Sequence, residues 1–293
     1  MAQKMLTSRD ALKTYRYLRL GMVGAVVLLA TSILIEHGDV VSGCWQTSIS
    51  AYYYTPVRAV FVGAMITVGF ALIVIKGRSP VEDAFLNAAG MFAPVVGIAP
   101  TTDVGRCWSL APNPLPVEPD GSLARWVVAN IDNNFPALLV VAAVGILASG
   151  IIAVLDNQGV RGTSEPLDRG KILTLVAATL TLLVGWWLFE NWGDFYTKMH
   201  GYSAILMFVF LIGAVGSRVY AHRANRGAYF WVYLAVGLVM VVGGAFVWLS
   251  RIFEEHTVFA LEALEIAAFA VFWLVQTWEH WDEGELSDTP LTT

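Results

Sequence analysis

Apolar residues gather in eight long segments of the chain, separated by short polar stretches. Each segment approaches the ~20 residues that an α-helix needs to cross about 30 Å of hydrocarbon. Backbone groups in lipid must be hydrogen-bonded within the chain, so segments of this length form helices. The predicted helices cover residues 19–36, 57–76, 83–100, 135–155, 171–189, 200–221, 228–249 and 257–278. The predicted fold class is therefore all-α, a polytopic transmembrane helix bundle.

The polar stretches leave no room for a soluble domain, and the only long one is a predicted external segment at 101–134. We expect a cytoplasmic segment at 1–18, one transmembrane domain at 19–279 and a disordered acidic tail at 280–293. The first apolar segment follows a polar stretch and lacks a small-residue cleavage site. We therefore expect it to stay as a helix, with a cleaved signal peptide as the alternative.

Composition supports a membrane protein. The chain is 57% hydrophobic and 14% charged, whereas soluble domains carry about 25% charged residues. The net charge is −5, and the acidic residues divide almost evenly between the two predicted sides of the membrane. Nothing in this distribution indicates a nucleic-acid partner.

Basic residues predict the orientation, because short cytoplasmic loops retain lysine and arginine. Of the 18 lysines and arginines, 13 fall on the side of the N-terminus, among them Arg19, Arg78 and Arg218. Eight helices then place both termini in the cytoplasm. This orientation puts Cys44 and Cys107, the only cysteines of the chain, in external loops. We expect a disulfide between them, with two free thiols as the alternative.

Helices in lipid associate through close packing of small residues. The third predicted helix carries Ala89, Ala93 and Gly97 at spacings of four, together with Asn87 and Pro94. We expect this helix to be central in the bundle. The chain has no convincing internal repeat, which counts against the inverted-repeat transporters.

The outer ends of several predicted helices carry polar and ionisable side chains. The stretch SISAYYYTPVRAVFVG at 48–63 places serines, three tyrosines and an arginine directly before the second helix. We expect a ligand-binding pocket that opens to the outside and is built from Ser48, Ser50, Tyr53, Arg58, Asp103, His200, Glu262 and Glu265. Each member also has a structural alternative: a helix cap, an aromatic belt, an interface histidine, or a salt bridge from Arg58 to a glutamate.

Glu262 and Glu265 are the most informative members, because they lie inside the apolar stretch VFALEALEIAAFAVFWLVQ. Residues three apart share a helix face. A carboxylate inside a membrane helix is costly unless it faces protein, water or a partner, so it marks a candidate functional site. The alternative is that the eighth helix begins later and leaves Glu262 at the headgroups.

The segments SISAYYYTPVRAVFVG, EDAFLNAAGMFAPVVGIAPT, MHGYSAILMF and EALEIAAFAVFWLVQT resemble a group of uncharacterised bacterial multi-pass membrane proteins. This resemblance covers most of the bundle and implies a bacterial plasma membrane, but it implies no activity. The outer Ser, Asp and His are loosely similar to alkaline ceramidases and adiponectin-receptor-like hydrolases, in which three histidines hold zinc. This sequence has no H-x-x-x-H pair, so a zinc site would need His37, His200 and His256 to converge, or carboxylates such as Asp103 to substitute.

The leading functional hypothesis is an integral membrane protein, of unassigned activity, that binds a lipid headgroup or small polar ligand without a cofactor. The first alternative is a metal-dependent lipid hydrolase that uses His200, Asp103 and a glutamate. Two others are a proton-coupled transporter, in which Glu262 and Glu265 exchange protons, and an accessory subunit of a membrane complex. Expected partners are membrane lipids, and a membrane-protein partner or a homo-oligomer is left open.

Overall fold

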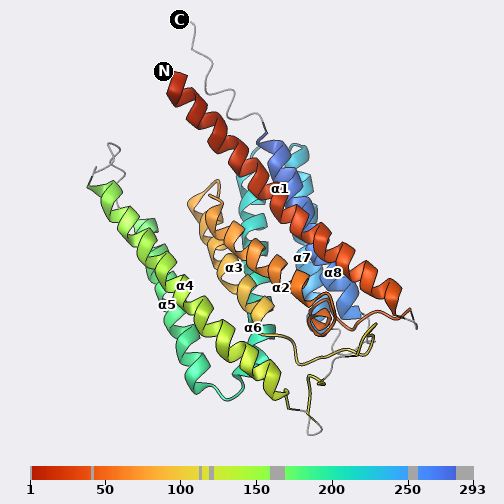
Figure 1. Cartoon of the computed structure of the whole chain (residues 1–293). Coiled ribbons are helices and arrows are strands. Elements are labelled where there is room, and N and C mark those ends of the chain that lie inside the picture. The colour runs from red at the N-terminus through yellow and green to blue at the C-terminus, as the bar shows by residue number, and fades with distance from the viewer. Residues whose placement is uncertain are drawn as a thin grey trace, which may run out of the picture.

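The structure is a computed structural model and describes residues 2–40, 43–111, 114–118, 122–158, 169–249 and 257–281. The described residues form eight α-helices and one short 3-10 helix, and their only β pairing is an isolated bridge between Val117 and Leu123. The elements are α1 (Ala2–Asp39), η1 (Ser50–Tyr54), α2 (Arg58–Val74), α3 (Pro80–Ile98), α4 (Arg125–Asn157), α5 (Arg169–Asn191), α6 (Phe195–Ala221), α7 (Ala228–Leu249) and α8 (Thr257–Glu279). Figure 1 shows their arrangement.

Seven of these helices are long and apolar enough to cross a membrane, and α2 is a shorter apolar helix of 17 residues. The helix η1 directly precedes α2, and all five of its residues are buried. This architecture confirms the predicted fold class: the chain is a polytopic helical bundle of a multi-pass membrane protein.

Helix α1 begins and helix α8 ends on the same side of the bundle, which we call the terminal side (Figure 1). The loops that carry Cys44 and Cys107 lie on the opposite side, which we call the disulfide side (Figure 1). An even number of crossings places the start of α1 and the end of α8 on the same side. The assignment of the terminal side to the cytoplasm is still a prediction from the lysine and arginine distribution.

Helix α3 lies between α2 and α6 and packs closely against both. Ala89 and Ala93 are completely buried. A Cβ atom on Gly69 of α2 would come within 2.6 Å of the Pro94 ring, and a Cβ on Gly90 would come within 2.6 Å of the Gly69 carbonyl oxygen. Small residues therefore let the two backbones approach, and the predicted central position of this helix is confirmed.

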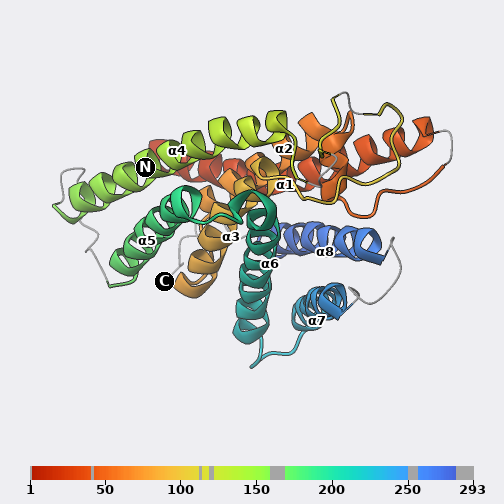
Figure 2. The ribbon, with the colours of Figure 1, turned by 90° about the horizontal axis from the view of Figure 1, so that it is seen from below.

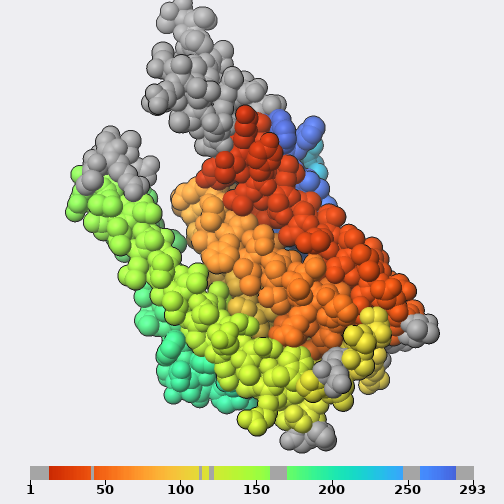
Figure 3. All heavy atoms as spheres, viewed as in Figure 1, coloured from red at the N-terminus to blue at the C-terminus, as the bar shows by residue number. Residues whose placement is uncertain are grey.

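Helices α4 and α5 form a hairpin that touches the bundle mainly on the disulfide side. Its buried contacts come from one face of α4, namely Val127, Ile131, Phe135 and Leu139. Phe135 meets Phe189 and Phe195, with ring centroids 5.4 and 4.9 Å away. Towards the terminal side α4 stands apart from α2 and α3, as the space-filling view shows (Figure 3), and the view from below shows the hairpin at one edge of the bundle (Figure 2).

The prediction of an external loop as far as residue 134 is wrong, because α4 already begins at Arg125. The four-residue spacing of Val127, Ile131 and Phe135 buries this first part of the helix against the hydrophobic core. The apolar pattern is interrupted by Asp132, Asn133 and Asn134. Hydropathy alone therefore predicts a loop where the helix already begins.

The loops on the disulfide side are joined by the predicted disulfide, which is confirmed: Cys44 and Cys107 are bonded, with Cα atoms 5.8 Å apart. The buried Gln46 amide reinforces this connection, because its oxygen accepts from the Arg106 and Cys107 N–H groups at 3.1 and 3.4 Å. Glu36, at the end of α1, accepts from the N–H and hydroxyl of Ser109 at 3.0 and 2.8 Å. The two cysteine-bearing loops on the disulfide side therefore form one unit.

Candidate functional site

The structure joins several of the predicted site residues around η1. The His200 Nδ1 atom lies 2.7 Å from the Ala99 carbonyl oxygen and 3.2 Å from that of Val96. Carbonyl oxygens only accept, so Nδ1 carries a proton. The His200 Nε2 atom lies 2.9 Å from the Ser50 hydroxyl. His200 thus links η1 to the end of α3, and both of its ring nitrogens have partners.

Glu262 and Ser48 hold the other end of the same turn. The Glu262 carboxylate accepts from the Ile49 N–H at 2.6 Å. The Ser48 hydroxyl accepts from the Ala51 N–H at 3.1 Å. Side chains from α6 and α8 therefore converge on η1 as the predicted site requires, but they use their hydrogen bonds to hold a buried turn in place.

Tyr53 and Arg58 form a second group on the disulfide side. The Arg58 guanidinium donates to the Tyr53 hydroxyl at 2.9 Å and lies over the rings of Tyr53 and Trp126 at 4.4 and 5.1 Å. Arg58 therefore pairs with aromatic rings, and no ion pair joins it to the described glutamates. The neighbouring Tyr54 donates to the Thr101 carbonyl at 2.6 Å, and burial raises the pKa of its phenol.

Asp103 lies on an exposed loop, where its carboxylate accepts from the Gly105 N–H at 3.1 Å. The structure therefore does not connect it to His200. No group of three His, Cys, Asp or Glu side chains in the described part of the chain is arranged to hold a metal ion. His256, one of the three histidines considered for zinc, lies outside the described residues.

Glu265 lies one helical turn beyond Glu262 and is only 4% exposed. Its Oε1 atom has no hydrogen-bond partner among the described residues. The carboxyl packs against α7 at two consecutive glycines: Cβ atoms on Gly243 and Gly244 would lie 3.2 and 3.4 Å from Oε1. A polar atom without a partner inside an apolar span is costly, so this position calls for an explanation other than packing.

An apolar groove of about 420 Å³ lies between α7 and α8 beside this carboxyl. It is lined by Leu238, Val239, Val242, Gly243, Phe246, Leu261 and Leu264. Several of these side chains are open to the surroundings of the bundle, among them Val242, which is 62% exposed. Gly243 both lines the groove and faces the Glu265 carboxyl, so only a residue without a side chain separates the two.

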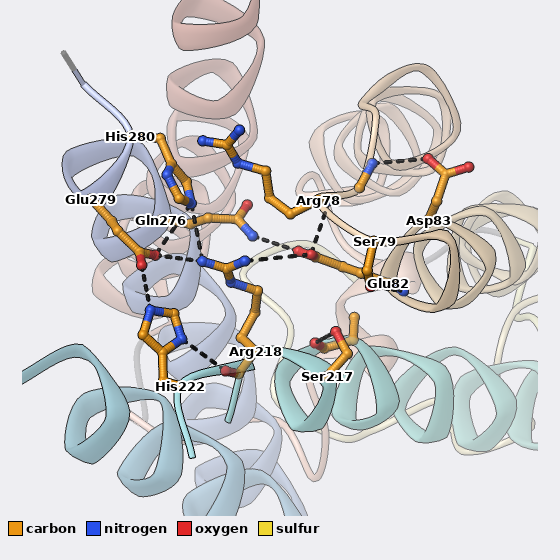
Figure 4. A network of polar contacts seen from close by, with 12 residues as sticks. Arg78, Ser79, Glu82, Asp83, Ser217, Arg218, His222, Gln276, Glu279 and His280 are labelled. Carbon is orange, nitrogen blue, oxygen red and sulfur yellow. Dashed lines mark hydrogen bonds and ion pairs between the residues drawn. The ribbon is translucent and has the colours of Figure 1, made fainter. Parts of the chain in front are cut away.

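A buried network of charges on the terminal side was missed by the sequence analysis (Figure 4). Arg218, in the last turn of α6, donates to Glu279 of α8 at 2.8 Å and lies 3.9 Å from Glu82 of α3. Glu279 also lies 2.7 Å from the His222 Nε2 atom and accepts from the Tyr233 hydroxyl at 2.6 Å. Arg218 and Glu82 are 6% and 1% exposed. Three helices, α3, α6 and α8, therefore place charged side chains in one buried cluster, and α7 adds the Tyr233 hydroxyl.

Glu82 has partners on each of its carboxylate oxygens. Oε1 accepts from the Gln276 amide at 2.5 Å, and Oε2 accepts from the Arg78 N–H at 3.0 Å. The Ser79 hydroxyl caps α3 by accepting from the Glu82 N–H at 3.1 Å. The cap and Pro80 at the first helical position start α3 here, which directs Glu82 into the bundle.

Two further groups beside the network, Arg78 and His280, lie outside the spans. Burial lowers the pKa of Arg78, the charge of Arg218 lowers it further, and Glu279 and Glu82 oppose this change. Burial, with the positive charge of Arg78, lowers the pKa of His280 to about 4. The His280 Nε2 atom lies 3.1 Å from the Arg218 guanidinium, which can only donate, so this nitrogen acts as an acceptor. Figure 4 shows the Arg78 side chain extending in the direction of His280.

The positive-inside count placed Arg78 and Arg218 in cytoplasmic loops, where solvent would surround them. A sequence signal for the network was nevertheless present. The S-P-x-E start of α3 at 79–82 matches a helix cap, and Arg218 and Glu279 each continue an apolar helix by a few residues. Only the packing of α3, α6 and α8 shows that these residues face one another.

No protein-family model, no curated protein and no solved structure matches this chain. The chain is thus assigned to a class by its own architecture, that of multi-pass helical membrane proteins.

Proposed function

We propose that this protein binds a membrane lipid, or another amphiphile with a polar group, in the groove between α7 and α8, where Glu265 supplies the polar contact. The observation that carries the proposal is the Glu265 carboxyl, which is buried and has an oxygen without a partner beside Gly243 of the groove. A hydrogen-bond donor on a ligand would satisfy that oxygen.

The groove suits a lipid-like ligand in size and chemistry. Ligand sites commonly measure about 300–1,000 Å³ and are mostly apolar with a few polar groups, and this groove measures about 420 Å³ with only Leu, Val, Phe and Gly side chains along it. It runs along the disulfide-side half of α7 and α8. With the predicted orientation, the ligand would enter sideways from the outer leaflet.

In this proposal, the residues around η1 have a structural role: they hold the disulfide-side half of the bundle in place. Glu262 and His200 fix η1 through hydrogen bonds at 2.6 and 2.9 Å, and Glu262 is one turn from Glu265 on α8. These contacts would hold the disulfide-side end of α8 in place while a ligand occupies the groove. Ser48 and Ser50 act through the same turn.

The test compares lipids that remain with the detergent-purified protein, identified by mass spectrometry after extraction. Gly243→Leu places a side chain between the groove and the carboxyl, and Glu265→Leu removes the polar contact. Gly216→Leu is the matched control, because a Cβ at Gly216 meets nothing within 4 Å. The proposal expects one amphiphile to be enriched with wild type and with the control and to be lost from the other two. An equal lipid composition in all four samples would refute it.

A second candidate function, proton-coupled transport, is favoured by the position of Glu265 along α8. The residue lies between two polar networks, that of His200 and Glu262 on one side and that of Arg218 and Glu279 on the other. If the two networks open alternately to the two sides of the membrane, the Glu265 carboxyl between them can take up a proton on one side and release it on the other. Proteoliposomes with an internal pH dye test this idea: substrate-driven proton flux should be lost in Glu265→Gln. Equal flux through that variant would rule the function out.

A further inference from the structure

Three arginines of the described chain lie in or beside the network on the terminal side. They are Arg19 from α1, Arg78 from the α2–α3 loop and Arg218 from α6, and two carboxylates of the described residues, Glu82 and Glu279, lie among them. The charge of Arg19 interacts with the charges of Arg78, Glu82 and Arg218. Buried charges are stabilised only when they are paired and hydrogen-bonded.

The two carboxylates are already committed to other donors. Glu279 accepts from Arg218 and from the Tyr233 hydroxyl, and it also lies 2.7 Å from His222. Glu82 accepts from the Gln276 amide and from the Arg78 N–H. Neither carboxylate is therefore hydrogen-bonded to Arg19.

Arg19 is the unusual member of the cluster. It is 8% exposed, yet it makes no hydrogen bond or ion pair with the described residues, and its Nε atom is buried without a partner. Its nearest aromatic contact is the face of Trp273, at 5.9 Å from the ring centroid. Arginine stays charged and can only donate. The missing partner must therefore be an acceptor, and a negatively charged one.

Other buried donors on the terminal side also lack partners. They are the Nε atoms of Arg16 and Arg218 and the Trp273 indole nitrogen, and one acceptor, the Gln276 Oε1 atom, is likewise unsatisfied. Because donors outnumber acceptors among these atoms, an oxygen-rich anion fits the set better than a cation does. Phosphate oxygens match the planar fork of guanidinium groups.

From these observations we propose that the terminal side of the bundle holds a binding site for a phosphate group, with Arg19 as its main contact and Arg218 Nε and Trp273 as further donors. The site lies away from the α7–α8 groove and does not depend on the function proposed for it. The phosphate belongs either to an anionic phospholipid or to a free phosphate ion.

The surface next to Arg19 is compatible with the lipid source. An apolar groove of about 400 Å³ between α1 and α2 is lined by Tyr17, Leu18, Gly21, Met22, Ile66, Thr67, Phe70, Ala71 and Val74. Leu18 and Met22 are close neighbours of Arg19 on α1. An acyl chain in this groove would bring its phosphate to the level of Arg19. Basic sites of this kind between helices are known to bind anionic headgroups.

The test measures binding by the full-length protein in delipidated detergent micelles, using native mass spectrometry. The probes are phosphatidylglycerol, phosphatidylcholine and inorganic phosphate. The variant Arg19→Gln removes the charge and keeps a polar side chain of similar shape. Lys13→Gln is the matched control, because Lys13 lies on the same helix and its side chain is exposed. The melting temperature of each ligand-free protein shows whether the variant folds.

The proposal expects wild type and Lys13→Gln to bind phosphatidylglycerol in preference to phosphatidylcholine. It expects Arg19→Gln to bind at least about tenfold more weakly, because a charge-assisted hydrogen bond is lost. Competition by inorganic phosphate would assign the site to the phosphate group alone, and its absence would assign the site to a phospholipid. If Arg19→Gln melts early, Arg19→Lys, which keeps the charge without the fork, should fold and still bind more weakly than wild type.

Three outcomes would overturn the proposal. The first is that folded Arg19→Gln binds phosphatidylglycerol and phosphate as tightly as wild type, and the second is that wild type binds neither. The third concerns the acidic residues after Trp281. Binding that appears only when Asp282→Asn and Glu283→Gln are introduced into the full chain would show that the chain itself supplies the anion.

Discussion

Removing the charge of Arg218 tests the buried network most directly. In the variant Arg218→Met, a side chain of similar length remains but the guanidinium is lost. The Arg218 side chain is 7% exposed and those of its partners Glu279 and Glu82 are 9% and 1% exposed. The variant therefore leaves two buried carboxylates without the cation between them.

The expected loss follows from the contacts that remain. Breaking a buried ion pair by removing one partner costs about 3–5 kcal/mol. Tyr233 and Gln276 still donate to the two carboxylates, at 2.6 and 2.5 Å, so we expect a value at the lower end, about 3 kcal/mol. The double variant Arg218→Met with Glu279→Gln removes one of the stranded charges. It should recover at least about 1 kcal/mol of that loss, which is a typical coupling energy for residues in contact.

The assay is reversible unfolding in mixed micelles of dodecyl maltoside and SDS at neutral pH, followed by tryptophan fluorescence. Lys76→Met is the control, because Lys76 pairs with Asp83 at 3.3 Å while its own side chain is 70% exposed. Exposed pairs contribute about 0–1 kcal/mol. If Arg218→Met costs no more than Lys76→Met, or if the double variant loses the sum of the two single effects, the network is not a coupled buried cluster.

Three further predictions concern other parts of the bundle. Cys44→Ser removes a disulfide between residues 63 apart in sequence, so the free energy of unfolding should fall by about 4 kcal/mol. Reduced wild type should match the variant, and a reduced wild type as stable as the oxidised protein would contradict this prediction. Gly69→Ala should lower the free energy of unfolding by about 1–3 kcal/mol through overpacking, because its Cβ would lie 2.6 Å from the Pro94 ring. Gly63→Ala is the control, because a Cβ at Gly63 meets nothing within 4 Å. Equal unfolding midpoints for the two variants would disprove the close contact. Burial lowers the pKa of His280 to about 4 from the ordinary 6.5, so the unfolded chain binds more protons between these values and stability should fall by up to about 3 kcal/mol as the pH is lowered through this window. His280→Gln should have a smaller slope of stability against pH there, and an identical slope would show that His280 is not the cause.

The candidate sites show which properties of a residue the sequence predicts and which it does not. Glu262 and Glu265 were both recognised because each interrupts an apolar stretch, but the sequence could not separate their surroundings. The structure gives Glu262 a hydrogen bond to the Ile49 N–H and leaves one oxygen of Glu265 without a partner beside Gly243. The difference arises from η1 and α7, two other elements that meet α8 only in the folded bundle.

The sequence by itself determined the class of protein, the presence of eight apolar helical segments and the disulfide. Hydrocarbon thickness sets the length of an apolar helix, and backbone hydrogen bonding in lipid leaves few alternatives to a helix. The bond between Cys44 and Cys107 followed from two cysteines in loops on the same side. These properties depend on local composition and on the count of crossings, and neither depends on how the helices pack.

The tertiary structure alone decided which charged residues are buried together. Arg218 and Glu279 stand near the ends of α6 and α8, and Arg19 stands where the apolar part of α1 begins, so a sequence reading places all three among headgroups and water. Packing of α1, α6 and α8 turns them inward and removes that water. The energy of a charge depends on its surroundings far more than on its neighbours in sequence, so the buried network and the unpartnered Arg19 become visible only once the helices are in place.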